Sequence, residues 1–344
     1  MTVAQKLNKP FGPAKLDRPL QIGPVRIPNR VFLAPMSGVT DVPFRDRAAA
    51  SGAGLVVSEM VASREFAQGS SESEVRALKG ASGIHMVQLA GREAYWMGEA
   101  TKRLEQLGVD MIDINMGCPA KKVTGGYSGS ALMRDLDHAL SLIEATVSAA
   151  ECPVTLKMRL GWDEHSINAP ELARRAVDAG VSMITVHGRT RCQFYTGVAD
   201  WQAVRAVRKA VKVPLVVNGD IVDLLTAETA LERSGADAVM TGRGTYGQPW
   251  LPGMLASQKA ISPGSIGDYV IAHYEDMLSH YGLETGIRHA RKHLGWYLAR
   301  HAQLMPPATK AQLMTSVDPH EVMRLIRIAD WTLDNSSLSL KVAA

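Results

Sequence analysis

The sequence lacks long apolar runs and is poor in cysteine. No apolar stretch approaches the roughly 20 residues that a membrane-spanning helix needs, and the N-terminal residues contain no apolar core of a secretory signal. The three cysteines, Cys118, Cys152 and Cys192, have neither the number nor the spacing of a disulfide framework or a zinc site. We therefore expect a cytoplasmic protein with free thiols, no membrane contact and no metal.

The charge of the chain is not extreme either. The formal net charge is +4, with 46% hydrophobic and 21% charged residues, which is ordinary for a soluble globular protein. This small positive excess permits an acidic partner such as nucleic acid but does not require one. With 344 residues, the chain has room for one large domain, or for a barrel of about 250 residues plus an appendage.

Short apolar runs recur along the chain at a regular spacing. They lie at residues 31–36, 54–60, 85–91, 111–117, 153–161, 183–190, 214–220 and 238–244. Helical patterns lie between them, for example at residues 171–180, 201–211 and 225–237. Eight apolar strands that alternate with helices predict an α/β fold of the (β/α)8 TIM barrel type, because the alternation is too regular for an open doubly wound sheet.

This alternation stops near residue 255, which suggests a division of the chain. We predict a flexible N-terminal arm over residues 1–18 and a frayed tail over residues 336–344. The barrel occupies residues 19–254 and begins with a short hairpin around Gly23-Pro24. A C-terminal helical domain over residues 255–335 follows.

Polar or flexible residues mark the C-terminal end of each apolar run. In a barrel these ends share one rim, so residues far apart in the sequence are predicted to line one pocket. Alone, Lys157 could point outward and His187 could be a satisfied core histidine, but their shared position favours the pocket. The residues are Pro35, Met36, Ser37, Ser58, Glu59, Gln88, Asn115, Cys118, Lys157, His187, Asn218, Gly219, Asp220, Gly242 and Arg243.

Cys118 is the strongest single candidate for a catalytic residue. It stands between glycine and proline directly after an apolar strand, with Asn115 before it and Lys121 and Lys122 after it. Most free cysteines are small core residues. In a core loop these polar neighbours would all need internal partners, so they favour a displayed, functional thiol.

A glycine-rich stretch follows the eighth apolar run. GRGTYG, residues 242–247, matches the dinucleotide pattern G-x-G-x-x-G, but a lone match is weak and no acidic residue follows about 20 positions later at another strand end. We interpret it, together with Asn218-Gly219-Asp220, as the phosphate site that barrels place after strands seven and eight. Such a site fits flavin mononucleotide (FMN) as well as a phosphorylated substrate.

Seven motifs together resemble those of the tRNA-dihydrouridine synthases, most closely the bacterial B subfamily. They cover nearly the whole barrel, and GCPAKKV with VQLAG before it and HGRTR after it is quite specific to the family. The departures are Ser37, where alanine is common, and Ser128. The motifs are APMSGVTDVPFR (34–45), VQLAG (87–91), DINMGCPAKKV (113–123), VTLKMRLGW (154–162), HGRTR (187–191), NGDI (218–221) and GADAVMTGRG (235–244).

The resemblance implies an oxidoreductase that uses FMN and NADPH to reduce the C5=C6 bond of a uridine in tRNA. It places Pro35, Met36, Ser37, Gln88, Lys157, His187, Asn218, Gly219, Asp220, Gly242 and Arg243 around the flavin. Cys118 would donate the proton to C5, since an ordinary thiol with a pKa of about 8.5 is mostly protonated at neutral pH. Lys157 would favour the anionic reduced flavin, and Gln88 would bond the edge of its ring.

Substrate contacts are expected both in the barrel and in the appendage. Asn115 is placed to bond the uracil, which must leave its stack to reach the flavin. RNA contacts are expected at Lys121, Lys122, Arg189 and Arg191 of the barrel, and at Arg288, Arg291, Lys292 and Trp296 of a helix over residues 287–300. One face of that helix is apolar, and the other is basic with almost no acid and a tryptophan in its middle, which favours tRNA contact over an ordinary solvated face.

Three alternatives remain open at this point. An FMN-dependent oxidoreductase of free pyrimidines, of the dihydroorotate or dihydropyrimidine dehydrogenase type, would share the barrel and the loop cysteine but would not need a basic helical appendage. A non-catalytic RNA-binding barrel would not need the complete rim. A cysteine hydrolase that pairs Cys118 with His187 would not need a flavin site. The sequence gives no sign of an obligate protein partner.

Overall fold

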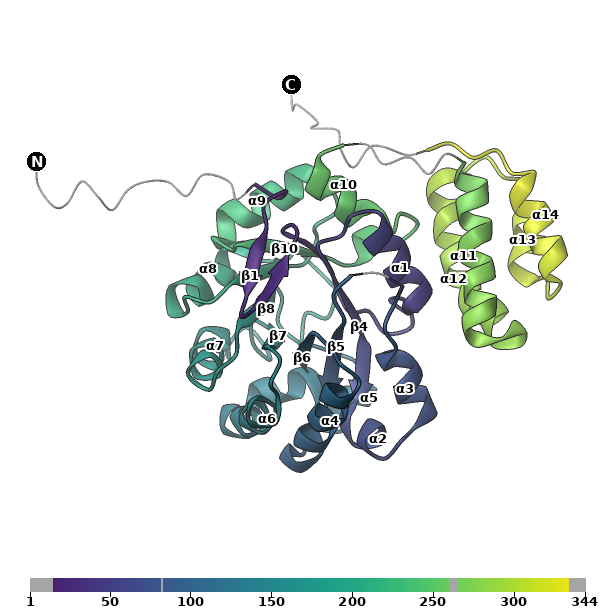
Figure 1. Cartoon of the computed structure of the whole chain (residues 1–344). Coiled ribbons are helices and arrows are strands. Elements are labelled where there is room, and N and C mark those ends of the chain that lie inside the picture. Colours follow the sequence, from purple (N-terminus) through teal and green to yellow (C-terminus); the bar gives the residue numbers. More distant parts are fainter. Residues whose placement is uncertain (1–14, 82, 260–264, 334–344) are drawn as a thin grey trace, which may run out of the picture.

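A closed barrel of eight parallel strands forms the body of the protein (Figure 1). The structure, a computed structural model, describes residues 15–81, 83–259 and 265–333. The last strand pairs with the first, which closes the sheet and confirms the TIM barrel and all eight predicted strands. The strands are β3 (Val31–Leu33), β4 (Leu55–Ala62), β5 (Met86–Ala90), β6 (Met111–Met116), β7 (Val154–Arg159), β8 (Met183–His187), β9 (Leu215–Asn218) and β10 (Ala238–Thr241).

The predicted hairpin closes one end of this barrel. β1 (Leu20–Ile22) and β2 (Val25–Ile27) pair antiparallel and pack their apolar side chains against strand residues such as Met111 and Met183. The predicted arm over residues 1–18 lies mostly outside the described residues. Its last residues are packed, however, since Leu16 is only 1% exposed, so the ordered barrel begins before residue 19.

Helices surround the barrel, and acidic residues begin several of them. Asp41, Asp135, Asp200 and Asp223 each accept a hydrogen bond from a backbone N–H of the first helical turn, which stabilises the helix start. The helices are α1 (Val42–Ala50), α2 (Ser63–Ala67), α3 (Ser71–Ala77), α4 (Ala94–Gln106), α5 (Lys121–Thr124), α6 (Leu136–Ala149), α7 (Ala169–Asp178), α8 (Trp201–Ala210), α9 (Leu224–Ser234) and α10 (Leu251–Ser257), with 3-10 turns η2 (Gly129–Arg134) and η3 (Arg243–Thr245). None of the helices within the described ranges is both long and apolar enough to cross a membrane.

A group of helices at the C-terminus stands beside α1 (Figure 1). It consists of α11 (Ile266–Tyr281), α12 (Leu283–His301), α13 (Pro307–Thr315) and α14 (Pro319–Arg327). The boundary expected after residue 254 falls inside α10, whose buried side chains pack on the barrel, so the helical domain begins at α11. The predicted tail over residues 336–344 lies outside the described part of the chain.

The helical domain docks on the barrel through α11 and through one face of α12, and the burial of this α12 face corrects the expectation for it. The apolar residues expected to be buried are buried, but His293 on the opposite face is also only 2% exposed and packs on Phe44. Trp296 stacks on Tyr246 of the barrel, with ring centroids 3.8 Å apart and planes 9° from parallel. The acids that balance this face belong to other elements, because Asp41 and Glu59 of the barrel lie near Lys292.

The glycine-rich stretch after β10 takes part in the same contact. A Cβ on Gly247 would lie 2.6 Å from the carbonyl oxygen of Trp296, and Gly247 has a φ of 72°. The His301 Nε2 atom lies 2.8 Å from the Gly247 carbonyl oxygen. The third glycine of the G-x-G-x-x-G match therefore lets α12 approach the barrel closely.

Asp41 at this interface gives a testable pH dependence. It is 2% exposed and accepts hydrogen bonds from Phe44 N and from the Tyr281 hydroxyl. Burial, aided by the Glu59 carboxylate and opposed by those hydrogen bonds, raises the pKa of Asp41 from 3.8 to about 6. Because the folded state binds this proton more tightly than the unfolded chain, the contribution of Asp41 to the free energy of unfolding falls as the pH rises from about 4 to about 6.

We expect Asp41→Asn to abolish this fall in the free energy of unfolding with rising pH. Relative to the parent, the variant should gain stability between about pH 4 and pH 7, by up to about 3 kcal/mol for a shift of this size. Denaturant unfolding at the two pH values measures the gain. Asp276→Asn, which removes the exposed acid of the Arg47–Asp276 ion pair at the same interface, is the matched control and should show no comparable gain. A difference between parent and Asp41→Asn that is independent of pH would contradict the prediction.

Candidate active site

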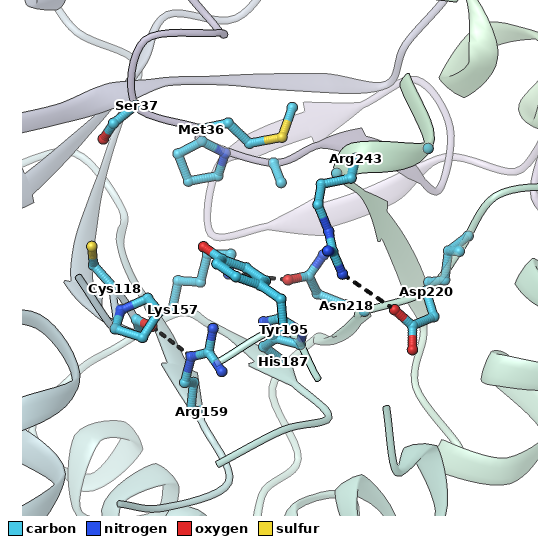
Figure 2. A pocket seen from close by; sticks show the side chains of 18 of the residues that line it. Met36, Ser37, Cys118, Lys157, Arg159, His187, Tyr195, Asn218, Asp220 and Arg243 are labelled. Carbon is cyan, nitrogen blue, oxygen red and sulfur yellow. Dashed lines mark hydrogen bonds and ion pairs between the residues drawn. The ribbon is translucent and has the colours of Figure 1, made fainter. Parts of the chain in front are cut away.

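The predicted strand-end residues converge on one cavity of about 640 Å³ at the C-terminal rim of the barrel (Figure 2). Ser58 and Glu59 are exceptions, because neither lines the cavity. The Glu59 carboxylate accepts a hydrogen bond from Gly38 N, and the Ser58 hydroxyl donates to the Glu59 carbonyl oxygen. The predicted residues that line the cavity are Pro35, Met36, Ser37, Gln88, Asn115, Cys118, Lys157, His187, Asn218, Gly219, Asp220, Gly242 and Arg243. The sequence therefore predicted which residues meet, and their roles stay predictions.

The loop that carries Cys118 is held from several sides. Asn115 Oδ1 accepts hydrogen bonds from Gly117 N at 3.1 Å and from Cys118 N at 3.0 Å. The Cys118 carbonyl oxygen accepts from both the backbone N and the hydroxyl of Ser130. Gly129, with φ 60°, leaves no room for a side chain, because a Cβ there would lie 2.8 Å from the Cys118 oxygen. Cys118 is half-buried and lines the cavity, and its role as a displayed catalytic thiol stays a prediction.

Asn115 makes hydrogen bonds inside the protein that the sequence did not predict. Its amide nitrogen donates to Gln88 Oε1 at 2.7 Å, while its oxygen binds the Cys118 loop. With its oxygen and one N–H occupied, Asn115 has little capacity left for a uracil. The expectation of a substrate contact at this residue is therefore weakened, and its contacts favour a positioning role.

Burial controls the charges at the centre of the cavity. Burial and, secondarily, the Arg159 charge lower the pKa of Lys157 to about 8, and its ammonium donates to Asn218 Oδ1 at 3.2 Å. Burial and then the Lys157 charge hold the pKa of His187 well below its ordinary value, so its imidazole is neutral. His187 Nε2 lies 3.3 Å from Arg189 Nη1, and because a guanidinium only donates, this nitrogen is the acceptor. The centre of the cavity thus offers a cation and a neutral ring.

One side of the cavity carries a guanidinium that suits a phosphate, with a carboxylate beside it. In Figure 2, Arg243 and Asp220 lie across the cavity from Cys118, with Tyr195 between them. Arg243 Nη2 lies 3.7 Å from Asp220 Oδ1, and the guanidinium lies over the Tyr195 ring at 4.7 Å. Burial would raise the pKa of Asp220, but hydrogen bonds from Arg189 and Ala199 N lower it overall, so this carboxylate is ionised.

Arg189 does not lie where an RNA contact requires it. It is 1% exposed and binds Asp220 through both terminal nitrogens, at 2.9 and 2.6 Å, and it also donates to two loop carbonyls. A guanidinium with its donors occupied inside the protein has none to offer a surface ligand. The RNA contact predicted at Arg189 is therefore wrong, and the residue holds Asp220 and the loop after β8 in place.

The other predicted RNA contacts form two separate groups. Lys121 and Lys122 are exposed at the start of α5, directly after the cavity-lining Ala120. The Arg191 guanidinium lies 4.5 Å from the centre of the Trp162 ring and 4.6 Å from that of the Phe194 ring. On α12, Arg288 is exposed, and Arg291 donates to the Thr315 carbonyl at 3.0 Å. Lys292 and Trp296 face the barrel, so neither is free for RNA in the way the sequence suggested.

Several cavity residues were not predicted. Arg159 lies two residues after Lys157, so strand periodicity places it on the same side and could have revealed it. Met60, Tyr195 and Tyr246 gave no signal, since they lie on an apolar run or in loops. Arg300 reaches the cavity from α12, a contact that depends on how the helical domain docks.

Comparison with known proteins relates the chain to enzymes that act on tRNA. A model of the family described as dihydrouridine synthase (Dus) matches residues 32–330. A probable tRNA-dihydrouridine synthase of Rhizobium leguminosarum is 61% identical over 86% of this chain and 93% of the relative. The tRNA-dihydrouridine synthase B of Xanthomonas axonopodis is 44% identical over 83% of this chain and 88% of its own length.

Solved structures with the same fold are more distant in sequence. Morphinone reductase matches with a TM-score of 0.53 at 17% identity, over 75% of this chain and 93% of that protein. The old yellow enzyme from Trypanosoma cruzi matches with a TM-score of 0.52 at 13% identity, over 72% of this chain and 93% of that protein. At such identities these matches support the barrel fold alone.

Proposed function

Because the chain belongs to the dihydrouridine synthase family, we propose that it reduces the C5=C6 bond of a uridine in tRNA to 5,6-dihydrouridine, with FMN as the cofactor and NADPH as the reductant. The observation that carries the proposal is the position of Cys118. Its thiol lines the cavity across from Arg243 and Asp220, so a base placed between them is within reach of both a proton donor and a phosphate-anchored cofactor.

The cavity residues fit FMN by size and by chemistry. Ligand pockets usually have volumes of about 300–1,000 Å³, and the volume here lies inside that range. Arg243 and the glycine backbone around Gly219 and Gly242 suit a phosphate. Lys157 suits the negative charge of a reduced flavin ring, and neutral His187 adds no second charge beside it. When bound, FMN would supply the hydride that adds to C6 of the uracil.

The residues of the chain would complete the addition with a proton. Negative charge that develops on C5 and its conjugated carbonyl passes to the Cys118 sulfur when the thiol gives its proton to C5, and solvent then returns a proton to the thiolate. Asn115 and Ser130 hold the loop, so the thiol is positioned before substrate arrives. Lys157 and Arg159 add positive charge near the site and favour the electron-rich transition state.

We propose that tRNA is held by residues on both sides of the cavity mouth. Lys121, Lys122 and Arg191 would contact the phosphate backbone on the α5 side, and Arg288 would do so on the α12 side. Since the thiol lies within a cavity, the uridine must leave its stack to reach it. An oxidoreductase of free pyrimidines would need neither group of cations. The relatives that match most of the chain are named as tRNA-dihydrouridine synthases.

The direct test is to incubate the purified chain with NADPH and unmodified tRNA and to map dihydrouridine by mass spectrometry. We expect dihydrouridine at defined positions of tRNA and none from free uridine, uracil or orotate. Turnover of a free pyrimidine without any reduction of tRNA would overturn the proposal in favour of the alternative. A purified protein without flavin absorbance that binds tRNA would favour a non-catalytic barrel.

A separate prediction concerns the phosphate side of the cavity. Arg243→Ala should purify partly or wholly without flavin while keeping its fold, because it loses charge-assisted hydrogen bonds to the phosphate. Flavin absorbance per protein and circular dichroism measure the two quantities. Arg243→Lys keeps the charge but not the paired donors and should show an intermediate flavin content. Full flavin occupancy in well-folded Arg243→Ala would contradict the assignment.

A further inference from the structure

A chain of hydrogen bonds runs beneath the cavity from a buried carboxylate to the Cys118 loop. Asp113 is 2% exposed on β6 and does not line the cavity. Thr155 donates to its Oδ1 at 2.5 Å, and the Gln88 amide donates to its Oδ2 at 2.6 Å. From Gln88 the chain continues through Asn115 to the backbone N–H groups of Gly117 and Cys118. Every link lies on the adjacent strands β5, β6 and β7 or in the loop after β6.

The direction of this chain is fixed at one end by the backbone. Because backbone N–H groups only donate, Asn115 must present its oxygen to the loop and therefore its nitrogen to Gln88. Gln88 must then present its oxygen to Asn115 and its nitrogen to the next group. That next group has to be an acceptor, and Asp113 supplies it. Either end thus determines the orientation of both amides.

Asp113 can serve in this way whether or not it is ionised. Burial raises its pKa, and the hydrogen bonds from Gln88 and Thr155 oppose that rise. If a proton is bound, it can sit on Oδ1 and be donated to the Thr155 hydroxyl, which accepts as well as it donates. The oxygen that faces Gln88 remains an acceptor in both states.

We propose that Asp113 is a positioning residue for the reaction: it supplies the buried acceptor that the orientations of Gln88 and Asn115 require, and so helps to hold the Cys118 thiol in position. The same orientation means that Gln88, which lines the cavity, presents only its second N–H to a ligand, because its oxygen is bound to Asn115. The catalytic part of this inference rests on the proposed function. The structural part, the position of the thiol, does not.

The test exchanges an acid and an amide at two positions of the hydrogen-bond chain, Asp113 and Asn115. In Asp113→Asn, the new amide can donate to Thr155 and accept from Gln88, so all bonds survive and activity should stay within about 3-fold of the parent. In Asn115→Asp, the loop amides keep an acceptor, but Gln88 is left between two carboxylates and one acceptor loses its donor. Activity should then fall about 10- to 100-fold.

The double exchange Asp113→Asn with Asn115→Asp should restore the chain in the reverse direction. The new Asn at 113 donates to the Gln88 oxygen, and Gln88 donates to the new Asp at 115, which still accepts from the loop. We expect the double variant to be at least about 5-fold more active than Asn115→Asp. If the two substitutions acted independently, the double variant would be no more active than Asn115→Asp. If Asn115→Asp fails to fold, the double variant must restore folding.

Two readouts separate this inference from the proposed function. The first is the rate at which tRNA reoxidises the reduced flavin, compared with the rate at which NADPH reduces it, and only the former should follow the pattern above. The second is the alkylation rate of Cys118 by iodoacetamide, with exposed Cys192 as an internal reference, measured by peptide mass spectrometry. It should change in Asn115→Asp and return in the double variant, even if tRNA proves not to be the substrate. A double variant no better than Asn115→Asp in both readouts would overturn the role of Asp113.

Discussion

Cys118→Ala is expected to bind FMN and to be reduced by NADPH at a near-normal rate, and then to fail in turning over uridine. The proposed role of Cys118 belongs only to the step in which C5 receives its proton, so the flavin half-reaction with NADPH should be spared. Removal of a positioned general acid typically costs about two to four orders of magnitude. Anaerobic stopped-flow measurement of flavin reduction by NADPH and of reoxidation by tRNA separates the two steps.

The other two cysteines provide matched controls. Cys192 is exposed in the loop after β8, and alanine there should leave both steps unchanged. Cys152 precedes β7 at the opposite end of the barrel from the cavity, and burial together with Glu105 raises its pKa to about 12, so it is a poor acid. Reduced Cys118→Ala that tRNA reoxidises as fast as the parent would remove the thiol from the mechanism. Failure of NADPH to reduce it would instead indicate damage to the flavin site.

Arg159→Ala is expected to lower both the stability and the activity of the protein. Arg159 is 1% exposed and donates to the carbonyl oxygens of Gly117, Thr190 and Phe194, each at 2.8 Å. Burial lowers its pKa to about 10, so the guanidinium stays charged at neutral pH. Hydrogen bonds from a charged group contribute about 1.5–3 kcal/mol each, so the loss of three should cost at least about 3 kcal/mol of unfolding free energy.

Activity should fall in the same variant because two loops lose their common anchor. Gly117 precedes Cys118 in the chain, and Phe194 precedes Tyr195, which also lines the cavity, so two segments of the cavity lining are freed together. We expect at least a 10-fold loss in the tRNA half-reaction, a rough figure for a displaced catalytic group. Chemical denaturation and stopped-flow reoxidation measure the two effects.

Arg134→Ala is the matched control for this prediction. Arg134 lies in the neighbouring turn η2 and is exposed, with its guanidinium over the Trp162 ring at 4.9 Å. An exposed contact of this kind contributes about 0.5–1 kcal/mol, so its loss should be small. If Arg159→Ala were as stable and as active as Arg134→Ala, the three carbonyl contacts would not hold the loops.

The barrel and its rim were predictable because each strand carries its own local signal. Every strand is a short apolar run that ends in a polar or flexible group, and the fold rule then places those ends together. Lys157 and His187 were ambiguous one at a time, yet the shared position of all the strand ends decided in favour of a cavity. The cavity residues, which lie on the seven motifs, could therefore be predicted without any information about contacts between distant parts of the chain.

The corrected and weakened predictions share one physical origin, which is that the sequence does not show the partners that a side chain finds elsewhere in the fold. The face of α12 with Lys292 looked unbalanced because its acids, Asp41 and Glu59, belong to the barrel. Arg189 looked like a surface cation because its partner Asp220 lies after a different strand. Asn115 looked free for a substrate because sequence spacing does not show that Gln88 and the backbone of its own loop occupy its amide.

The close contact at Gly247 changes how natural variation in this stretch should be interpreted. A substitution there would be read from the motif as damage to a nucleotide site, yet the atom that a new side chain meets first is the Trp296 carbonyl of α12. Such a variant would loosen the contact between the barrel and the helical domain, while the flavin contacts proposed for Gly242 and Arg243 would persist. Its phenotype would then be temperature sensitivity with normal cofactor content, the opposite of what a change at Arg243 should produce.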